Sequence, residues 1–377
     1  MATNHKPIFR ADHVGSLLRP ERLHEARSRL EHGEITGDEL RAIEDDCIAE
    51  VAKLQEDAGL QVITDGEFRR TVWWYEFIDA LKGVEIAEPD KDAAFSGGNE
   101  EWEYLPKTVR TVGKVGRPGE IMLREFEVLR AATNRTPKIT IPSPSRIHFH
   151  GGRAAVDKTA YPDMEQFWSD VALVYQQEIA SLETSGCTYI QIDDPVLTYF
   201  LDERLRANVS DIGEDPDELL SKYVEVINQC IAKRKPETQI GIHLCRGNSR
   251  SKWVAAGPYE PIAETIFPHL NVDTYLLEYD DERSGGFEPL RFMPDEKTVV
   301  LGLVTTKSGQ LEDTDTLKRR VDEASKFQPM ASLAISPQCG FASEVGGNII
   351  TLKDQIEKLR LVVHAAEDIW GSISAAA

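Results

Sequence analysis

Gln239-Ile240-Gly241-Ile242-His243-Leu244-Cys245 is the stretch around which the rest of the chain is interpreted. Its apolar run predicts a buried strand that ends in a histidine and a cysteine two residues apart. Side chains two apart in a strand point to the same face, so we expect the imidazole and the thiol side by side. Zinc favours such a nitrogen and sulfur pair. The alternative is that His243 and Cys245 are half-buried residues that only close a strand.

Further short apolar stretches alternate with helical patterns along the chain. The eight expected strands lie near residues 10, 62, 139, 190, 240, 276, 301 and 334. The helical patterns between them include residues 36–58, 163–185, 215–234, 316–326 and 352–366. Polar residues follow each strand directly, as in parallel barrels whose chemistry lies at the carboxyl ends of the strands. No glycine-rich phosphate loop follows the first strand, which disfavours a doubly wound nucleotide-binding sheet.

The sequence therefore predicts an α/β fold, a single (βα)8 TIM barrel that takes up residues 1–377 as one domain. The region of about 84–137 breaks the alternation. It contains the charge-rich piece 88–92, the pair Gly97-Gly98 and an alternating run over 108–115. We interpret this region as an insertion between strands two and three that contains a hairpin, not as a second domain.

Composition and charge restrict the partners of the protein. A chain of 377 residues that is 41% hydrophobic and 28% charged is typical of a globular enzyme. Its net charge of −21 argues against binding to nucleic acid or to an anionic membrane. Residues 1–10 are polar and no stretch approaches about 18 consecutive apolar residues, so a cytoplasmic location is expected. Five cysteines at irregular spacing form no disulfide framework, which leaves thiols available as ligands.

Two more strand ends carry metal-ligating residues, Glu278 and Cys339. On the rim of one barrel, these would converge with His243 and Cys245 into a set suited to tetrahedral Zn²⁺. Ligands spread over a rim favour a reactive site, and an incoming substrate thiol would displace Glu278 most readily. Zinc would deprotonate that thiol and make it a nucleophile toward an alkyl donor. The alternative is that the two cysteines are ordinary buried thiols.

At this point the residues carry a family resemblance. It extends over three further motifs: Asp12-His13-Val14-Gly15-Ser16, Asp65-Gly66-Glu67 and Gln191-Ile192-Asp193-Asp194-Pro195. With these motifs the chain resembles the catalytic C-terminal half of cobalamin-independent methionine synthase. The N-terminal barrel of that enzyme, which grips folate, has no counterpart here.

The resemblance implies a site for homocysteine as the thiol substrate. In the family a Gly-Ser turn holds the substrate carboxylate and two acidic residues hold its ammonium group. Carried over, these are Gly15 and Ser16, then Glu67 and Asp193, and His13 is assigned to the same substrate-binding rim. Backbone N–H groups and a hydroxyl suit a carboxylate, whereas paired carboxylates suit a cation. Asp193 is counted among the catalytic residues as well.

Two stretches depart from the family pattern. A family histidine after strand seven is thought to help protonate the methyl donor, but the matching stretch here is 304–307, so Lys307 or a neighbour would take that catalytic role. The donor-side loop after strand three is replaced by residues 143–146, which leaves open whether 5-methyltetrahydrofolate is the donor. Residues 73–75 are either an aromatic wall for the donor or part of the core.

We predict a zinc-dependent thiol alkyltransferase that methylates homocysteine to methionine. The alternative within the family is epoxyalkane:coenzyme M transferase, which opens an epoxide with a zinc-activated coenzyme M thiolate. In that case Arg19, Arg69, Arg70 or Arg146 would meet the sulfonate. Two further interpretations are a metal-free barrel similar to uroporphyrinogen decarboxylase and a zinc-stabilised binding protein. The sequence leaves the alkyl donor and the oligomeric state open, a homo-oligomer included.

Overall fold

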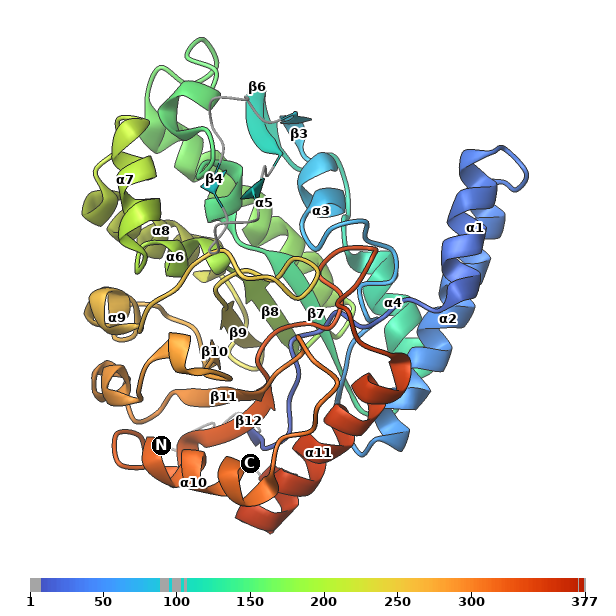
Figure 1. Cartoon of the computed structure of the whole chain (residues 1–377). Coiled ribbons are helices and arrows are strands. Elements are labelled where there is room, and N and C mark those ends of the chain that lie inside the picture. The colour runs from blue at the N-terminus through green and yellow to red at the C-terminus, as the bar shows by residue number, and fades with distance from the viewer. Residues whose placement is uncertain (1–7, 89–94, 97–102, 105–106, 372, 376–377) are drawn as a thin grey trace.

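A curled parallel β-sheet forms the centre of the computed structural model (Figure 1). The structure describes residues 8–88, 95–96, 103–104, 107–371 and 373–375. Within these residues, seven strands pair in the order β12-β11-β10-β9-β8-β7-β2, and all neighbours run parallel. The strands are β2 (Val62–Ile63), β7 (Thr136–Pro142), β8 (Tyr189–Asp193), β9 (Gln239–Leu244), β10 (Thr274–Glu278), β11 (Thr298–Val304) and β12 (Leu333–Pro337).

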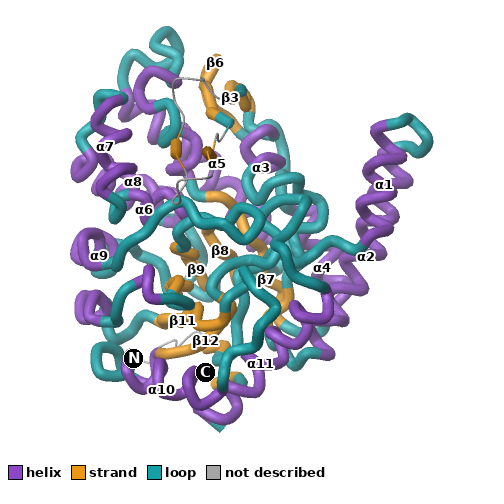
Figure 2. Tube along the Cα trace, viewed as in Figure 1, coloured by secondary structure: helices purple, strands orange, loops and turns teal. Residues whose placement is uncertain are grey.

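Helices surround this sheet, and the first of them projects away from the barrel (Figure 1). They are α1 (Glu21–Glu31), α2 (Gly37–Asp57), α3 (Tyr75–Asp79), α4 (Leu123–Ala132), α5 (Met164–Thr184), α6 (Pro195–Tyr199), α7 (Glu203–Asp211), α8 (Pro216–Ile231), α9 (Glu260–Ile266), α10 (Thr314–Ala324) and α11 (Leu352–Trp370). Because helices screen the outer face and side chains fill the inner one, every residue of β8 to β12 is buried. Loops, coloured teal in Figure 2, cross over the central strands.

The first predicted strand differs from the expectation. The regular element β1 (Ile8–Phe9) pairs antiparallel with β13 (Ser374–Ala375) instead of joining the parallel sheet. The next residues take the eighth place, because Ala11 forms a parallel bridge to Ile335 in β12. Toward β2 the contacts are irregular: the Thr64 hydroxyl donates to the carbonyl of Gly15 at 2.7 Å, and the Leu17 N–H donates to the carbonyl of Gly66 at 3.0 Å. The α/β barrel is therefore confirmed, with its first strand reduced to a bridge.

The predicted hairpin is present between β2 and β7. Strand β3 (Lys82–Ala87) pairs antiparallel with β6 (Thr108–Gly116), and β4 (Phe95–Ser96) pairs antiparallel with β5 (Glu103–Tyr104). The hairpin begins two residues before the expected start of the insertion at residue 84. The pair Gly97-Gly98 and most of the charge-rich piece lie outside the described residues.

The extent of the domain stays a prediction, because residues 1–7 and 376–377 also lie outside the described part of the chain. Within the described part, no helix combines the length and the apolar character that crossing a membrane requires. The long helices are amphipathic instead. Helix α2, for example, begins with a capping box between Thr36 and Glu39 and buries Cys47, Ile48 and Val51.

Candidate metal and substrate site

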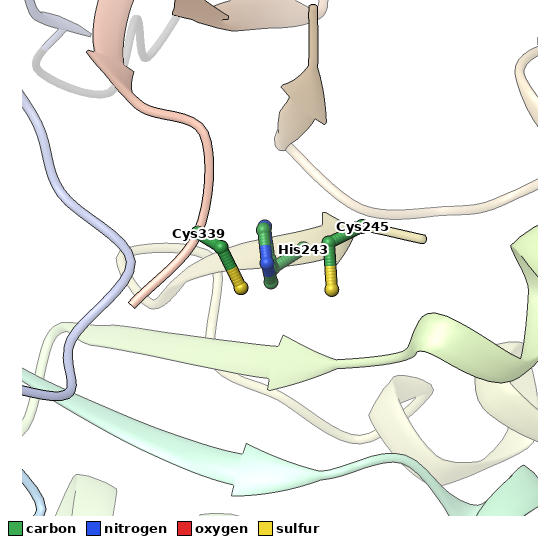
Figure 3. Close-up of side chains that lie close together, drawn as sticks. All are labelled: His243, Cys245 and Cys339. Carbon is green, nitrogen blue, oxygen red and sulfur yellow. The ribbon is translucent and has the colours of Figure 1, made fainter. Parts of the chain in front are cut away.

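Three of the predicted metal ligands lie together at the carboxyl ends of two strands (Figure 3). His243 lies in β9 and Cys245 follows directly after it, whereas Cys339 comes from the loop after β12. One ligand atom from each residue lies within 4.8 Å of the other two. All three side chains are buried, with 2%, 5% and 4% of their surface exposed. The spacing of two in the strand therefore places the imidazole and the thiol on one face, as expected.

The two cysteines of this group are unequal. A hydrogen bond from the Cys245 thiol lowers the pKa of Cys339 well below its usual range, and the nearby His243 lowers it further. The same hydrogen bond, followed by burial, raises the pKa of Cys245. Cys339 is therefore the more acidic thiol of the pair. A metal ion bound here would have to displace thiol protons, so its binding would depend on pH.

His243 tests whether a metal ion fits this group. Neither Nδ1 nor Nε2 of its imidazole makes a well-formed hydrogen bond to a described residue, although the ring is buried, and the polar group next to it is the Cys339 sulfur. A buried polar atom left without a partner costs about 1–3 kcal/mol, which a bond to a metal would offset. One nitrogen and two sulfur ligands are also a donor set that zinc favours. The residues present therefore fit a zinc ion.

Glu278, the fourth predicted ligand, lies outside this group and is held by cations. Its Oε1 accepts a hydrogen bond from Arg283 at 2.5 Å and lies 3.5 Å from the Lys307 ammonium. Its Oε2 accepts a hydrogen bond from the backbone N–H of Arg246 at 2.7 Å. Burial alone would raise the pKa of Glu278, but Lys307 and the two arginines lower it to about 2. The structure thus groups three of the four predicted ligands and gives the fourth other partners.

The two predicted ammonium-binding residues, Glu67 and Asp193, line the same cavity as the metal group. Burial, followed by repulsion from Glu67, raises the pKa of Asp193 to about 7, and burial also raises the pKa of Glu67. Glu67 has a φ of 58°, and its Oε1 accepts from the Thr140 hydroxyl at 2.8 Å and lies 3.4 Å from Arg70. Its buried Oε2 has no partner among the described residues. An ammonium group would supply the missing donor and positive charge.

The Gly15-Ser16 turn lies beside this acidic pair. Gly15 has a φ of 136°, and a Cβ there would come within 2.7 Å of the Thr140 methyl group, so the position requires glycine. Ser16 lines the cavity and is 3% exposed. The loop after β12 packs closely against it, because a Cβ on Gly340 would lie only 1.9 Å from the Ser16 hydroxyl. The turn is therefore fixed next to both Glu67 and the loop that carries Cys339.

His13 lies deeper, in the barrel interior, and is not among the described residues that line the cavity. Burial, followed by the charge of Lys138, lowers the pKa of His13 to about 4, so the ring is neutral. The buried Lys138 ammonium donates to Asp12 at 2.7 Å and to the side-chain Oε1 of Gln191 at 2.9 Å. The Gln191 amide in turn donates to Asp193 at 2.7 Å. This interior network therefore orients one of the carboxylates in the cavity.

Lys307, the predicted proton donor, is also absent from the described lining of the cavity. Its ammonium donates to Asp280 at 3.1 Å, besides its contact with Glu278. Burial lowers the pKa of Lys307, but these two carboxylates raise it by more, so the net shift is upward. A lysine that holds its proton this firmly is a weak acid at neutral pH.

The cavity has further lining residues that strand-end patterns do not identify. Arg146 stacks over the Trp74 ring at 3.8 Å from its centre, and the sequence suggests it only as an alternative contact for a sulfonate. His150, Tyr199 and Asn248 also line the cavity. They lie in loops and in α6, several residues beyond their strands, where a sequence carries no periodic signal.

The fold and the site together define an α/β barrel protein with a candidate metal centre at the carboxyl ends of its strands. Comparison with known proteins gives the family. Residues 9–368 match the model of the cobalamin-independent synthase catalytic domain, and the chain belongs to this family. The resemblance inferred from the motifs is thereby confirmed, and with it membership of a family of methyl-transferring enzymes.

Individual relatives agree with this assignment. The chain is 42% identical over 367 residues to the uncharacterized protein YxjH of Bacillus subtilis, across 97% of this chain and 96% of that protein. It is 26% identical over 357 residues to the 5-methyltetrahydropteroyltriglutamate–homocysteine methyltransferase of Thermosynechococcus vestitus, across 93% of this chain but 42% of that longer protein. A structure from Listeria monocytogenes, described as a candidate vitamin-B12-independent methionine synthase, matches with a TM-score of 0.77 and 35% identity, across 98% of this chain and 100% of that one.

Proposed function

We propose that this protein is a zinc-dependent thiol methyltransferase that converts homocysteine to methionine. The observation that carries the proposal is the shared cavity. It is lined by His243, Cys245 and Cys339, which could activate a thiol, and by Glu67 and Asp193, which could bind an ammonium group. A substrate with both groups on one short carbon chain fits this arrangement. The name of the relative from Thermosynechococcus vestitus, a homocysteine methyltransferase, supports the same acceptor.

Different residues would activate the substrate thiol and bind the rest of the substrate. His243, Cys245 and Cys339 would hold Zn²⁺, with Glu278 as the predicted fourth ligand, and the bound ion lowers the pKa of a thiol so that a thiolate exists at neutral pH. Glu67 and Asp193 bind the substrate ammonium group, and the Gly15-Ser16 turn binds its carboxylate. Burial of these side chains excludes water, which strengthens the ionic contacts.

In the chemical step the substrate sulfur forms a bond to the methyl carbon as the bond between that carbon and the donor breaks. The electron pair of the broken bond stays on the donor, which then takes up a proton. Lys307 as the source of this proton stays a prediction, and so does a donor of the 5-methyltetrahydrofolate type. A catalytic role for Asp193 stays a prediction as well, which its pKa of about 7 supports because such a group can exchange a proton near neutrality.

Coenzyme M is the competing acceptor, because the cavity also contains Arg146, a cation that suits a sulfonate. Calorimetric titration of zinc-loaded protein with homocysteine and with coenzyme M, each in two buffers of different ionisation enthalpy, separates the two and counts released protons. We expect homocysteine to bind more tightly and to release a proton. Preference for coenzyme M would replace methyl transfer by epoxide opening, and binding of neither thiol would contradict both functions.

A further inference from the structure

A buried lysine lies inside the barrel, and the proposed reaction makes no direct use of it. Lys138 belongs to β7, and none of its surface is exposed. Its ammonium group donates to Asp12 at 2.7 Å, to the carbonyl of His13 and to Oε1 of Gln191 at 2.9 Å. An ammonium group has three donors and no acceptor, so these three bonds satisfy it completely. The position of the lysine is therefore fixed.

Asp12, the counter-charge of this lysine, is equally well bonded. Its side chain is 2% exposed, and its second oxygen accepts from the Tyr189 hydroxyl at 2.9 Å. Because the ion pair is neutral as a whole, it does not repel a cation bound in the nearby cavity. A well-packed apolar pair of similar volume often stabilises a core as much as a buried ion pair does. Stability alone therefore does not require an ion pair at this position.

Lys138 fixes the orientation of the Gln191 amide. Since an ammonium group only donates, the amide oxygen has to face Lys138 and the amide nitrogen has to face the other way. That nitrogen donates to the carbonyl of Val14 at 2.5 Å and to Oδ1 of Asp193 at 2.7 Å. A flipped amide would place its nitrogen against the ammonium group and its oxygen against the Asp193 carboxylate, and both contacts are unfavourable.

We propose that Lys138 is a positioning residue for the ammonium site, which acts through Gln191 to hold the Asp193 carboxylate where it lines the cavity. It thereby favours substrates that carry an amino group over analogues without one. Lys138 itself is not among the described residues that line the cavity, so it does not touch the substrate. This inference rests on the proposed function, because Asp193 has to face the substrate ammonium group.

Two ligands that differ only in the amino group measure this effect. Methionine and its desamino analogue, methylthiobutanoate, share the thioether and the carboxylate. The ratio of their dissociation constants therefore reports the contribution of the ammonium group. Both are titrated by calorimetry into the full-length protein with Zn²⁺ in excess. We expect the wild-type protein to bind methionine at least about 30-fold more tightly than the desamino analogue.

The double variant Asp12→Asn/Lys138→Met removes the buried pair without a change of net charge. We expect its preference for methionine to fall by about tenfold, while its affinity for the desamino analogue changes by less than about threefold. Gln191→Met should give a similar loss of preference. Adding Gln191→Met to the double variant should cause little further loss, because both changes act on the same hydrogen bond to Asp193.

Lys358→Met is a matched control for the loss of a buried ammonium group. The Lys358 side chain is also fully buried and donates to Glu312 at 3.0 Å, but it lies in α11 and is not among the described residues that line the cavity. We expect this variant to unfold at a lower urea concentration and to keep the wild-type preference for methionine.

The results that would overturn the inference are distinct from those that would overturn the proposed function. An equal loss of affinity for both ligands would reduce the buried pair to a structural role. An unchanged preference in Gln191→Met would remove the route from Lys138 to Asp193, and this result counts even if the double variant does not fold. A wild-type protein without a preference for methionine would contradict the ammonium site and the proposed function with it.

Discussion

Two buried glutamates at the carboxyl ends of the strands, Glu67 and Glu278, have opposite surroundings. Both are at most 2% exposed. Burial raises the pKa of Glu67, and one of its oxygens has no partner among the described residues. Cations overcome the effect of burial at Glu278 and lower its pKa to about 2, and both of its oxygens are bonded.

Glu67 has an oxygen that a ligand can still bind, whereas both oxygens of Glu278 already accept hydrogen bonds from the protein. A buried carboxylate with an unused oxygen destabilises the folded state unless something binds to it. A buried carboxylate with complete hydrogen bonds contributes to the folded state instead. We therefore propose that Glu67 binds the substrate, and that Glu278, the predicted fourth ligand, stabilises the surroundings of the candidate metal centre while no ion is bound. The following predictions test this division.

Substitution of Glu67 by glutamine should have the largest effect on binding. Loss of the charge that faces the substrate ammonium group should weaken homocysteine binding by about 100-fold, measured by calorimetry. The melting temperature should change little, because removal of a desolvated charge is offset by loss of the counter-charge of the buried Arg70.

Glu125→Gln is a matched control for this change. The pKa of Glu125 is likewise raised by burial, but Glu125 is not among the described residues that line the cavity. The Glu125→Gln variant should bind homocysteine as tightly as the wild-type protein does. Unchanged affinity in Glu67→Gln would refute the assignment of this residue to the substrate.

Substitution of Glu278 by glutamine should mainly affect stability. It removes the counter-charge that the mostly buried Arg283 and Lys307 share and leaves them only Asp281 and Asp280, so we expect the free energy of unfolding to fall by about 1–3 kcal/mol in urea titrations. Zinc-free protein should bind methionine as before, because the carboxylate is not part of the substrate side. A stable variant that loses methionine binding would reverse the roles of the two glutamates.

Acid should affect the two sides of the site differently. The pKa of Asp193 is about 7, so its ammonium-binding charge is lost as the pH falls below that value. Methionine, which has no thiol, should bind zinc-free protein more weakly from pH 8 to pH 6, by at most about tenfold per pH unit for one proton. Glu278, with its lowered pKa, stays ionised over this range, and its contribution to stability is lost only as the pH falls from about 4.3 toward 2. Binding that does not change with pH would contradict the ammonium site.

The fold was largely predictable because its signals are local. The apolar runs that became β7 to β12 lie where the sequence places them, since a buried parallel strand needs a continuous apolar stretch. The first strand is less regular than the sequence predicts. Its pairing depends on residues far away in the sequence, because Ala11 bridges to Ile335 and β1 pairs with β13. A local sequence pattern does not contain this information.

The site was predictable only where chemistry and strand ends coincide. His243, Cys245 and Cys339 could be chosen because few other residue types bind zinc. The cations that contact Glu278 could not be predicted from the sequence. Arg283 ends the run Asp280-Asp281-Glu282-Arg283, which in sequence is indistinguishable from an exposed charged turn. Only the fold shows that its guanidinium is mostly covered and pairs with Glu278.

The most direct test of the account is the zinc content of the wild-type protein and of Cys245→Ser after dialysis, with circular dichroism as the control for folding. We predict that the wild-type protein retains a single zinc ion per chain and releases a proton on binding homocysteine. The variant should keep its fold and lose both the zinc ion and the proton release. A folded variant that still holds zinc and still releases the proton would contradict a metal centre formed by His243, Cys245 and Cys339.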